Sequence, residues 1–285
     1  GALGRMAERL ADLLAESKPA AIASTYPVYA YLLERIWRDS PRLRVPLFTV
    51  VTDSISINTV WTKCRSDWFL VANDETREVL VEMDVDPARI RVTGFPVAPD
   101  FADFADERAA RPRQPPWRAL YIVNAARRTA MELVAELLGR DDLDLTVTAG
   151  RSGALRRELS GLIAASGRAA TVLGWTSEMP RLMSRSHLLI GKAGGATTQE
   201  AIAACCPPII TRVVPGQEEG NAQLIERNGC GVVAGSEEQV PAALEAALAD
   251  NGARLRAWTA AIGGLSRPGA ALDIAGMIAD EIAAS

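Results

Sequence analysis

The residues with the clearest capacity for chemistry lie at 191–205, in the stretch GKAGGATTQEAIAAC. A short apolar run, 188–190, leads into Gly194 and Gly195, and a helix-forming run follows. Glycines let a ligand approach the backbone closely, and the first N–H groups of a helix carry partial positive charge without a partner inside the helix. The stretch therefore predicts an anion-binding helix start. The alternative interpretation is a plain tight turn between a strand and a helix.

Three polar side chains in the same stretch sharpen this hypothesis. Thr197 and Thr198 could cap the helix or donate a hydrogen bond to a ligand oxygen. Glu200 stands one turn into the helix, where its carboxylate could accept hydrogen bonds from two neighbouring hydroxyls, such as those of a ribose. Taken alone, Glu200 is more typical of a solvated helix glutamate.

A second polar group follows the next predicted strand, in TRVVPGQEEGNAQLIERNGCG. Gln217, Glu218 and Asn221 stand there at a helix start. Amides and carboxylates can bind several sugar hydroxyls at once, although Asn221 could instead be an N-cap. Because this group comes one strand–helix unit after the first, both belong to the same edge of one parallel sheet.

A third group, in FTVVTDSISINTVW, brings Asp53 to the end of a buried strand, with Asn58 and Trp61 after it. Asp53 is interpreted as an acid facing a cleft or, alternatively, as a turn residue. The only histidine, His187, starts an apolar strand, which favours a structural role. The two Asp-x-Asp matches, at 84–86 and 142–144, are interpreted as solvated turns rather than metal sites.

Short apolar segments alternate with amphipathic ones along the whole chain, which indicates α/β architecture with parallel sheets covered on both faces. The predicted strands are Ala20–Ser24, Leu47–Thr52, Trp68–Ala72, Arg89–Thr93, Ala119–Asn124, Leu143–Ala149, Ala170–Leu173, His187–Ile190, Pro208–Thr211 and Gly231–Ala234. Two doubly wound, Rossmann-like domains facing a cleft are expected, because ligands bind outside the carboxyl ends of such strands.

A proline-rich, charged segment marks the boundary between two domains. The alternation of strands and helices stops at this segment and restarts after it. We expect a first domain over 1–98, a linker over 99–116, a second domain over 117–268 and a C-terminal helix over 269–285 that is long enough to pack back on the first domain. The first domain has fewer strands than the second and opens with a helix, so it is expected to be truncated at its N-terminus.

Composition excludes several classes of function. The formal net charge is −4 and the pI is about 5.3, which argues against a nucleic-acid-binding protein. No apolar run approaches the roughly 20 residues that span a bilayer. The four cysteines form no Cys-x-x-Cys pair, so we expect neither disulfides nor a zinc site, and a reducing, cytoplasmic setting.

Taken together, these motifs resemble those of the GT-B glycosyltransferases that include monogalactosyldiacylglycerol synthase and the processive diacylglycerol glucosyltransferases. More distant is the resemblance to the peptidoglycan lipid-intermediate N-acetylglucosaminyltransferase. Besides the two stretches at 191–231, the matching segments keep their order along the chain: STYP, TVVTD through Trp61, IRVTGFPV, TAGRSGALRREL, GWTSEMPRLMSRSHLLIGKAGG and LSRPGAALDIA.

The resemblance implies an inverting transfer of galactose or glucose from a UDP-sugar to a lipid such as diacylglycerol, at the cytosolic face of a membrane and without a metal or other cofactor. In that scheme the glycines and threonines of 194–198 hold the diphosphate, Glu200 binds the ribose, and Gln217, Glu218 and Asn221 contact the sugar. The remaining implied roles fall to Trp175, Met179 and Arg151 at the nucleotide, and to Asp53, Tyr26, Asn58 and Trp61 on the acceptor side, with Asp53 as the catalytic base.

Two departures from the family pattern keep other functions open. The glycine-rich loop and histidine that open the first domain of these enzymes have no match here, and Arg127 and Arg128 replace the glycine-rich turn that opens the second. The alternatives are a nucleotide-sugar-binding homologue without transferase activity and a UDP-sugar epimerase of the same fold.

Overall fold

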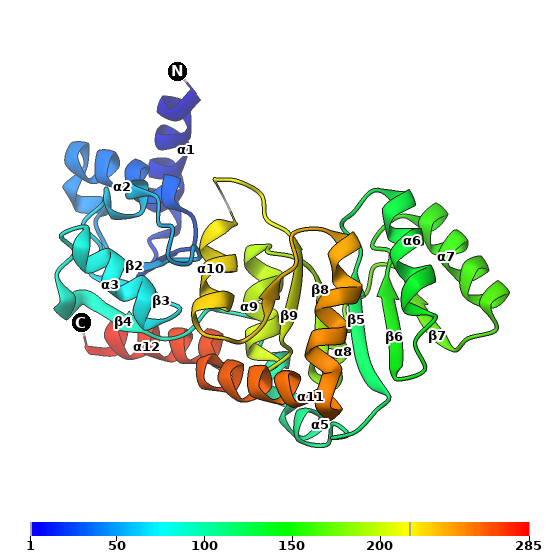
Figure 1. The fold of residues 1–285 in the computed structure, drawn as a ribbon. Coiled ribbons are helices and arrows are strands. Elements are labelled where there is room, and N and C mark those ends of the chain that lie inside the picture. The colour runs from blue at the N-terminus through cyan, green and yellow to red at the C-terminus, as the bar shows by residue number, and fades with distance from the viewer. Residues whose placement is uncertain (1, 217, 285) are drawn as a thin grey trace. The chain divides into compact units, whose positions relative to one another are not determined.

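The computed structural model describes residues 2–216 and 218–284, and the chain divides into two compact units. Unit 1 comprises residues 1–96 and 269–285, and unit 2 comprises residues 97–268. Each unit contains one parallel sheet with helices packed on its faces (Figure 1). Among the described residues, none of the helices combines the length and the apolar character needed to cross a membrane.

The sheet of unit 1 has four parallel strands in chain order, β1-β2-β3-β4. Its strands are β1 Ile22–Ser24, β2 Leu47–Val50, β3 Trp68–Val71 and β4 Ile90–Val92, and its helices are α1 Ala2–Ser17, α2 Pro27–Asp39, α3 Asp74–Glu82 and α12 Ala270–Ala284. Short 3-10 turns occupy Pro41–Leu43, Thr59–Thr62 and Pro87–Arg89. The two central strands, β2 and β3, are nearly all apolar because both faces of the sheet are covered there, whereas Arg91 and Val92 of the edge strand β4 are exposed.

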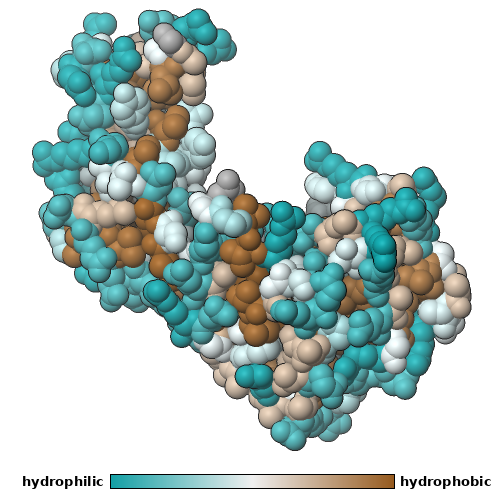
Figure 2. All heavy atoms as spheres, turned by 45° about the horizontal axis from the view of Figure 1, so that its top comes forward, coloured by the Kyte–Doolittle hydropathy of each residue, from teal (hydrophilic) through white to brown (hydrophobic). Residues whose placement is uncertain are grey.

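The two faces of this sheet are covered by different segments. Phe48, Val50 and Leu70 pack against Ile274 of α12, whereas Phe69 and Val71 pack on the other side with Trp61 and Leu80. The final helix therefore completes the core of unit 1. Large exposed side chains remain on α1 and α2 or directly before α2: Leu3, Met6, Leu13, Tyr26, Tyr29 and Tyr31. Hydrophobic residues, drawn in brown, also reach the surface among hydrophilic ones in the space-filling view (Figure 2).

The sheet of unit 2 has six parallel strands in the order β10-β9-β8-β5-β6-β7. They are β5 Trp117–Ile122, β6 Leu143–Thr148, β7 Ala170–Leu173, β8 Leu188–Lys192, β9 Pro208–Arg212 and β10 Val232–Val233. The chain winds outward from β5 to β7 and then returns to place β8 on the other side of β5. This reversal is the point at which doubly wound sheets bind ligands, beyond the carboxyl ends of the two central strands.

The helices of unit 2 connect these strands. They are α4 Asp100–Asp103, α5 Ala105–Ala109, α6 Arg127–Leu137, α7 Gly153–Ser166, α8 Met179–Arg185, α9 Gly195–Ala203, α10 Glu219–Arg227 and α11 Val240–Leu265, with a 3-10 turn at Glu237–Gln239. A break in α11 at 249–252 has positive φ angles at Asp250, Asn251 and Gly252, and separates two helical stretches.

The segment 99–116, predicted as a linker, lies within unit 2 and carries α4 and α5. The guanidinium of Arg111 donates hydrogen bonds to four backbone carbonyls at the carboxyl ends of α8 and α9, including Ser184 O at 2.7 Å and Cys205 O at 2.6 Å. These long-range contacts fix the segment to the second sheet's helices. The sequence shows no sustained periodicity there, because contacts across 72 to 94 residues leave no local pattern.

Candidate functional site

The start of α9 is the central feature of the candidate site. Gly194 occupies the N-cap with φ −63° and ψ 137°, and the helix begins at Gly195, directly beyond β8. Thr198 is buried, with its N–H donating to Gly194 O at 2.8 Å, and Thr197 is half-buried. The first N–H groups of a helix have no partner inside the helix, and this is the general property that an anion site at a helix start uses.

Glu200 lies one turn into the same helix, half-buried, and burial raises the pKa of its carboxyl. Burial of a carboxylate disfavours its charged form unless a donor compensates. A ligand that supplied two hydroxyl donors would relieve this penalty. The position is therefore compatible with the ribose contact that the sequence predicts.

Glu218 and Asn221, predicted to contact a sugar, bind the protein itself. The Glu218 carboxylate forms an ion pair with Lys192 and accepts a hydrogen bond from Val214 N at 3.0 Å. The Asn221 amide donates to Ala193 O at 3.0 Å. Both side chains are buried, with 6% and 7% of their surface exposed. They connect the start of α10 to the start of α9. Gln217, the third predicted sugar contact, lies outside the described residues.

The loop after β5 completes the reversal point of the sheet. Asn124 stands there with its amide donating to Ile122 O at 3.3 Å, while its buried Oδ1 has no partner within the described part of the chain. Arg127, which opens α6, pairs with Glu158 at 2.6 Å, and Arg128 pairs with Glu132 at 2.7 Å. The two arginines are thus engaged on the helix surfaces rather than placed on the turn.

The loops after β6 and β7 carry the residues predicted to contact the nucleotide. Arg151 is exposed between β6 and the Ser152 N-cap of α7. Trp175 has 67% of its surface exposed, and Met179 begins α8 half-buried. Because all strands are parallel, these residues share one sheet edge with the start of α9.

In unit 1, Asp53 follows β2 and accepts a hydrogen bond from the indole Nε1–H of Trp61 at 2.6 Å. Trp61 was expected on the acceptor side, but only 1% of it is exposed and it packs in the core of the unit. Trp61 therefore supports Asp53 from inside the core of unit 1 and does not itself line a surface. Asn58 caps the 3-10 turn by accepting from Val60 N at 2.9 Å, and Tyr26 is 58% exposed at the start of α2.

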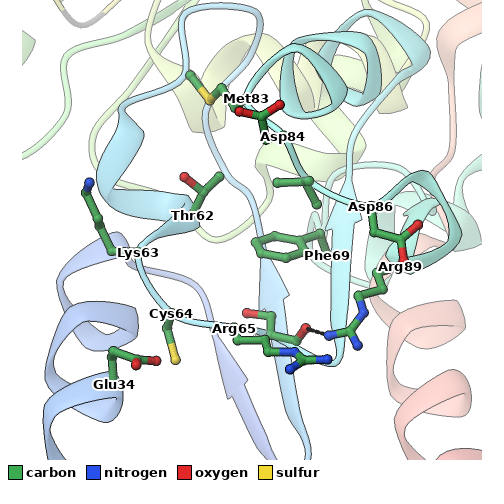
Figure 3. A pocket seen from close by; sticks show the side chains of 12 residues that line it. Glu34, Thr62, Lys63, Cys64, Arg65, Phe69, Met83, Asp84, Asp86 and Arg89 are labelled. Atoms are coloured by element: carbon green, nitrogen blue, oxygen red, sulfur yellow. Dashed lines mark hydrogen bonds between the residues drawn. The ribbon is translucent and has the colours of Figure 1, made fainter.

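A hollow of about 500 Å³ also lies in unit 1, lined by side chains from α2 and from the segments that precede β3 and β4 (Figure 3). Cys64, Lys63 and Arg65 come from the first of these segments, and Asp84 and Asp86 from the second. Since these residues lie before their strands, the hollow is at the opposite sheet edge from Asp53. It is not part of the candidate site.

The single histidine has a structural environment. His187 Nδ1 accepts from Arg118 N at 2.8 Å, Nε2 lies 2.7 Å from Pro112 O, and burial lowers the pKa of the ring. The described residues contain no cluster of three or more His, Cys, Asp or Glu side chains that could hold a metal ion.

One residue of this site is absent from the predictions made on the sequence. Lys192, the last residue of β8, stands beside the start of α9 and pairs with Glu218. The only local signal was its position, two residues before the glycine pair. Many strands end in this way, so the position alone did not single out Lys192.

Comparison with known proteins agrees with this architecture. The family model described as monogalactosyldiacylglycerol (MGDG) synthase matches residues 3–97. A processive diacylglycerol beta-glucosyltransferase from Bacillus subtilis (strain 168) is 30% identical over 249 residues, which cover 85% of this chain and 64% of that protein. The enzyme of the same name from Bacillus cytotoxicus is 28% identical over 96% of this chain and 71% of its own length.

Among solved structures, MurG from Acinetobacter baumannii matches with a TM-score of 0.66 and 14% identity, covering 98% of this chain and 78% of that chain. The chain has the GT-B fold. UDP-GlcNAc 2-epimerase from Neisseria meningitidis, bound to UDP-GlcNAc, matches with a TM-score of 0.67 and 12% identity, over 98% of this chain and 81% of that one. The resemblance to the diacylglycerol glycosyltransferases that the motifs indicate is thereby confirmed. The chain spans somewhat less than two thirds of the length of the Bacillus subtilis relative.

Proposed function

We propose that this chain carries the donor site of a glycosyltransferase that moves a hexose, galactose or glucose, from a UDP-sugar to a diacylglycerol-like lipid. The observation that carries the proposal is the start of α9 at the reversal point of the second sheet, with Glu200 half-buried one turn inside. The relatives with 28–30% identity that are named as diacylglycerol glucosyltransferases support the choice of acceptor.

The proposed chemistry is a single inverting displacement. An acceptor hydroxyl oxygen attacks the anomeric carbon, the bond between that carbon and the diphosphate oxygen breaks, and its electron pair leaves with UDP. The start of α9, rather than a metal ion, neutralises the charge that develops on the diphosphate; a single such donor is typically worth about 3 kcal/mol. The proton of the acceptor hydroxyl passes to the Asp53 carboxylate, which Trp61 holds in place.

The nucleotide and lipid contacts complete the proposal. Trp175, Met179 and Arg151 stand at the sheet edge where the base would lie, and the ribose hydroxyls would donate to Glu200. The exposed apolar side chains of α1 suit peripheral contact with a lipid surface. Tyr26 and Asn58 remain proposals for the acceptor side, and Gln217 for the sugar.

Calorimetric titration with UDP, UDP-glucose and UDP-galactose tests the donor site. Micromolar binding of UDP by the wild type, lost in Glu200→Ala and kept in Glu226→Ala, is the expected result. Glu226 is a matched control because it is an exposed helix glutamate in the same unit. Equal binding by both variants would contradict the ribose assignment, and no binding by the wild type would contradict the donor site.

Transfer is tested separately, with labelled UDP-sugar and vesicles that contain diacylglycerol. The expected product is a labelled glycolipid, which Asp53→Asn should abolish without loss of UDP binding. An epimerase is the second candidate, because structures of UDP-GlcNAc 2-epimerases match this fold as well as MurG does. An epimerase would release a changed UDP-sugar in the absence of any acceptor, so omission of the vesicles distinguishes the two.

A further inference from the structure

The structure assigns to Lys192 a role as the cationic ligand of the diphosphate, and to Glu218 the role of positioning it. This inference rests on the proposed nucleotide-sugar site. It concerns a residue outside the glycine–threonine stretch, and it changes the role of Glu218 from a sugar contact to a holder of the lysine side chain.

The first step is the position of the ammonium group. A Cβ atom built on Gly194 would lie 3.3 Å from Lys192 Cε and 3.5 Å from Lys192 Nζ. The lysine side chain therefore folds back across the N-cap of α9 instead of extending into solvent, although 42% of it remains exposed. A glycine at 194 leaves the room that this path needs. The ammonium group is thus placed at the start of the helix, on the side that remains accessible.

The second step is that a lysine is an unusual residue at this position, because its ammonium group lies at the positive end of a helix and is offset there by the Glu218 carboxylate. A helix N-terminus carries roughly half a positive charge, so cations are normally favoured at the other end, by roughly 0.3–1 kcal/mol. A lysine held over an N-cap opposes that rule. Local conflicts of this kind are expected where a site is built for a ligand, here one that brings negative charge.

The third step is the way in which Glu218 holds the lysine. One carboxylate oxygen pairs with Lys192 and the other accepts from Val214 N at 3.0 Å, and the glutamate is almost fully buried. A carboxylate with both oxygens engaged inside the protein is poorly placed to read sugar hydroxyls. It is well placed to fix one ammonium group and to keep the free site from accumulating uncompensated positive charge.

The chemistry that this arrangement recognises is a diphosphate. The start of α9 offers backbone N–H donors, Lys192 adds a full charge beside them, and the two together match a group with at least two negative charges. A neutral nucleoside would gain nothing from Lys192. The rival interpretation is that Lys192 only neutralises the buried Glu218 and never contacts a ligand.

The test compares Lys192→Met with Arg118→Met, titrating each with UDP and with uridine. Arg118 is a matched control because it is a partly exposed cation in the same sheet. It is the second residue of β5, at the sheet edge opposite to the start of α9, and it pairs with Asp144. We expect Lys192→Met to weaken UDP binding roughly ten- to hundredfold, as loss of a charged ligand does. Uridine binding should change less than twofold, and Arg118→Met should change neither.

A double variant separates binding from a structural role. Lys192→Met alone leaves Glu218 buried without its partner, so Lys192→Met with Glu218→Gln removes both charges. If Lys192 binds the diphosphate, the double variant keeps the low affinity for UDP and the wild-type affinity for uridine. If UDP affinity returns to that of the wild type, or if UDP and uridine weaken equally, the inference is overturned. Failure of the wild type to bind UDP would instead contradict the proposed function itself.

Discussion

Trp61 and Asp53 should be energetically coupled through their hydrogen bond, and the size of the coupling free energy follows from the geometry. The donor indole is fully buried, the acceptor carboxylate is partly exposed, and the two atoms are 2.6 Å apart. A hydrogen bond to a charged group contributes roughly 1.5–3 kcal/mol, and partial solvation of the acceptor lowers this figure. We therefore expect a coupling free energy of about 1–2 kcal/mol between Trp61 and Asp53.

The assay is a double-mutant cycle of Trp61→Phe and Asp53→Ala, measured as free energies of unfolding in urea by circular dichroism. Trp61→Phe alone should lower the free energy of unfolding by more than the coupling free energy, because removing part of a buried ring also leaves a cavity. The cycle subtracts that cavity, since it is present in both the single and the double variant.

A second tryptophan of the same unit supplies the control. Trp37 is also buried, and its indole donates at 3.1 Å to the backbone carbonyl of Leu43, a neutral acceptor. Trp37→Phe combined with Asp53→Ala should be additive within about 0.5 kcal/mol. The reasoning is refuted if the Trp61 cycle is also additive within that limit. In the transfer assay, Trp61→Phe should lower kcat more than it raises KM for the donor, because it releases Asp53 without touching the nucleotide site.

Three other measurements follow from single contacts. Burial raises the pKa of Glu200 above its usual 4.5, and ribose hydroxyls bind the ionised form, so uridine affinity should fall as the pH drops from neutrality toward 4.5. Glu200→Gln should flatten that profile in calorimetry; an unchanged slope would exclude Glu200 as its source. Arg111→Ala should lower the free energy of unfolding in urea by about 3 kcal/mol or more, since four carbonyls lose one charged donor, and a loss below about 1 kcal/mol would contradict this. Gly252→Ala should lower the melting temperature, because Gly252 has φ +76° and a methyl group would lie 2.7 Å from Trp117, whereas Gly263→Ala, in open space on the same helix, should not.

The periodicity of the sequence predicted the sheets well because each strand is short, apolar and bounded by polar turns. The predicted strand 143–149 and the observed β6, Leu143–Thr148, differ by one residue, and the predicted 170–173 coincides with β7. The order of strands in the sheet was not predictable in the same way. Placing β8 next to β5 is decided by packing between segments about 70 residues apart, which local pattern does not encode.

For the candidate site, the sequence predicted that its residues follow parallel strands and share one sheet edge, but it did not predict the contacts of each side chain. Glu218 and Asn221 have the chemistry of sugar ligands, and the same chemistry also suits ion pairing and backbone hydrogen bonds. Only the structure shows that they face Lys192 and Ala193. Likewise, Trp61 follows Asp53 closely in sequence, and only its burial shows that it supports the carboxylate from inside the core.

The short helix α9 explains why so many polar residues of this region bind protein rather than ligand. With nine residues, it makes few hydrogen bonds of its own, so its position depends on contacts at both ends. Arg111 binds carbonyls at its carboxyl end, Ser266 donates to Ala203 O at 2.9 Å, and Asn221 holds the loop before its first turn. A helix held in this way keeps its N–H groups fixed in one direction, which is the preorganisation that the proposed stabilisation of a leaving diphosphate would require. In that proposal, recognition falls to the backbone of the first turn, Lys192 and Glu200.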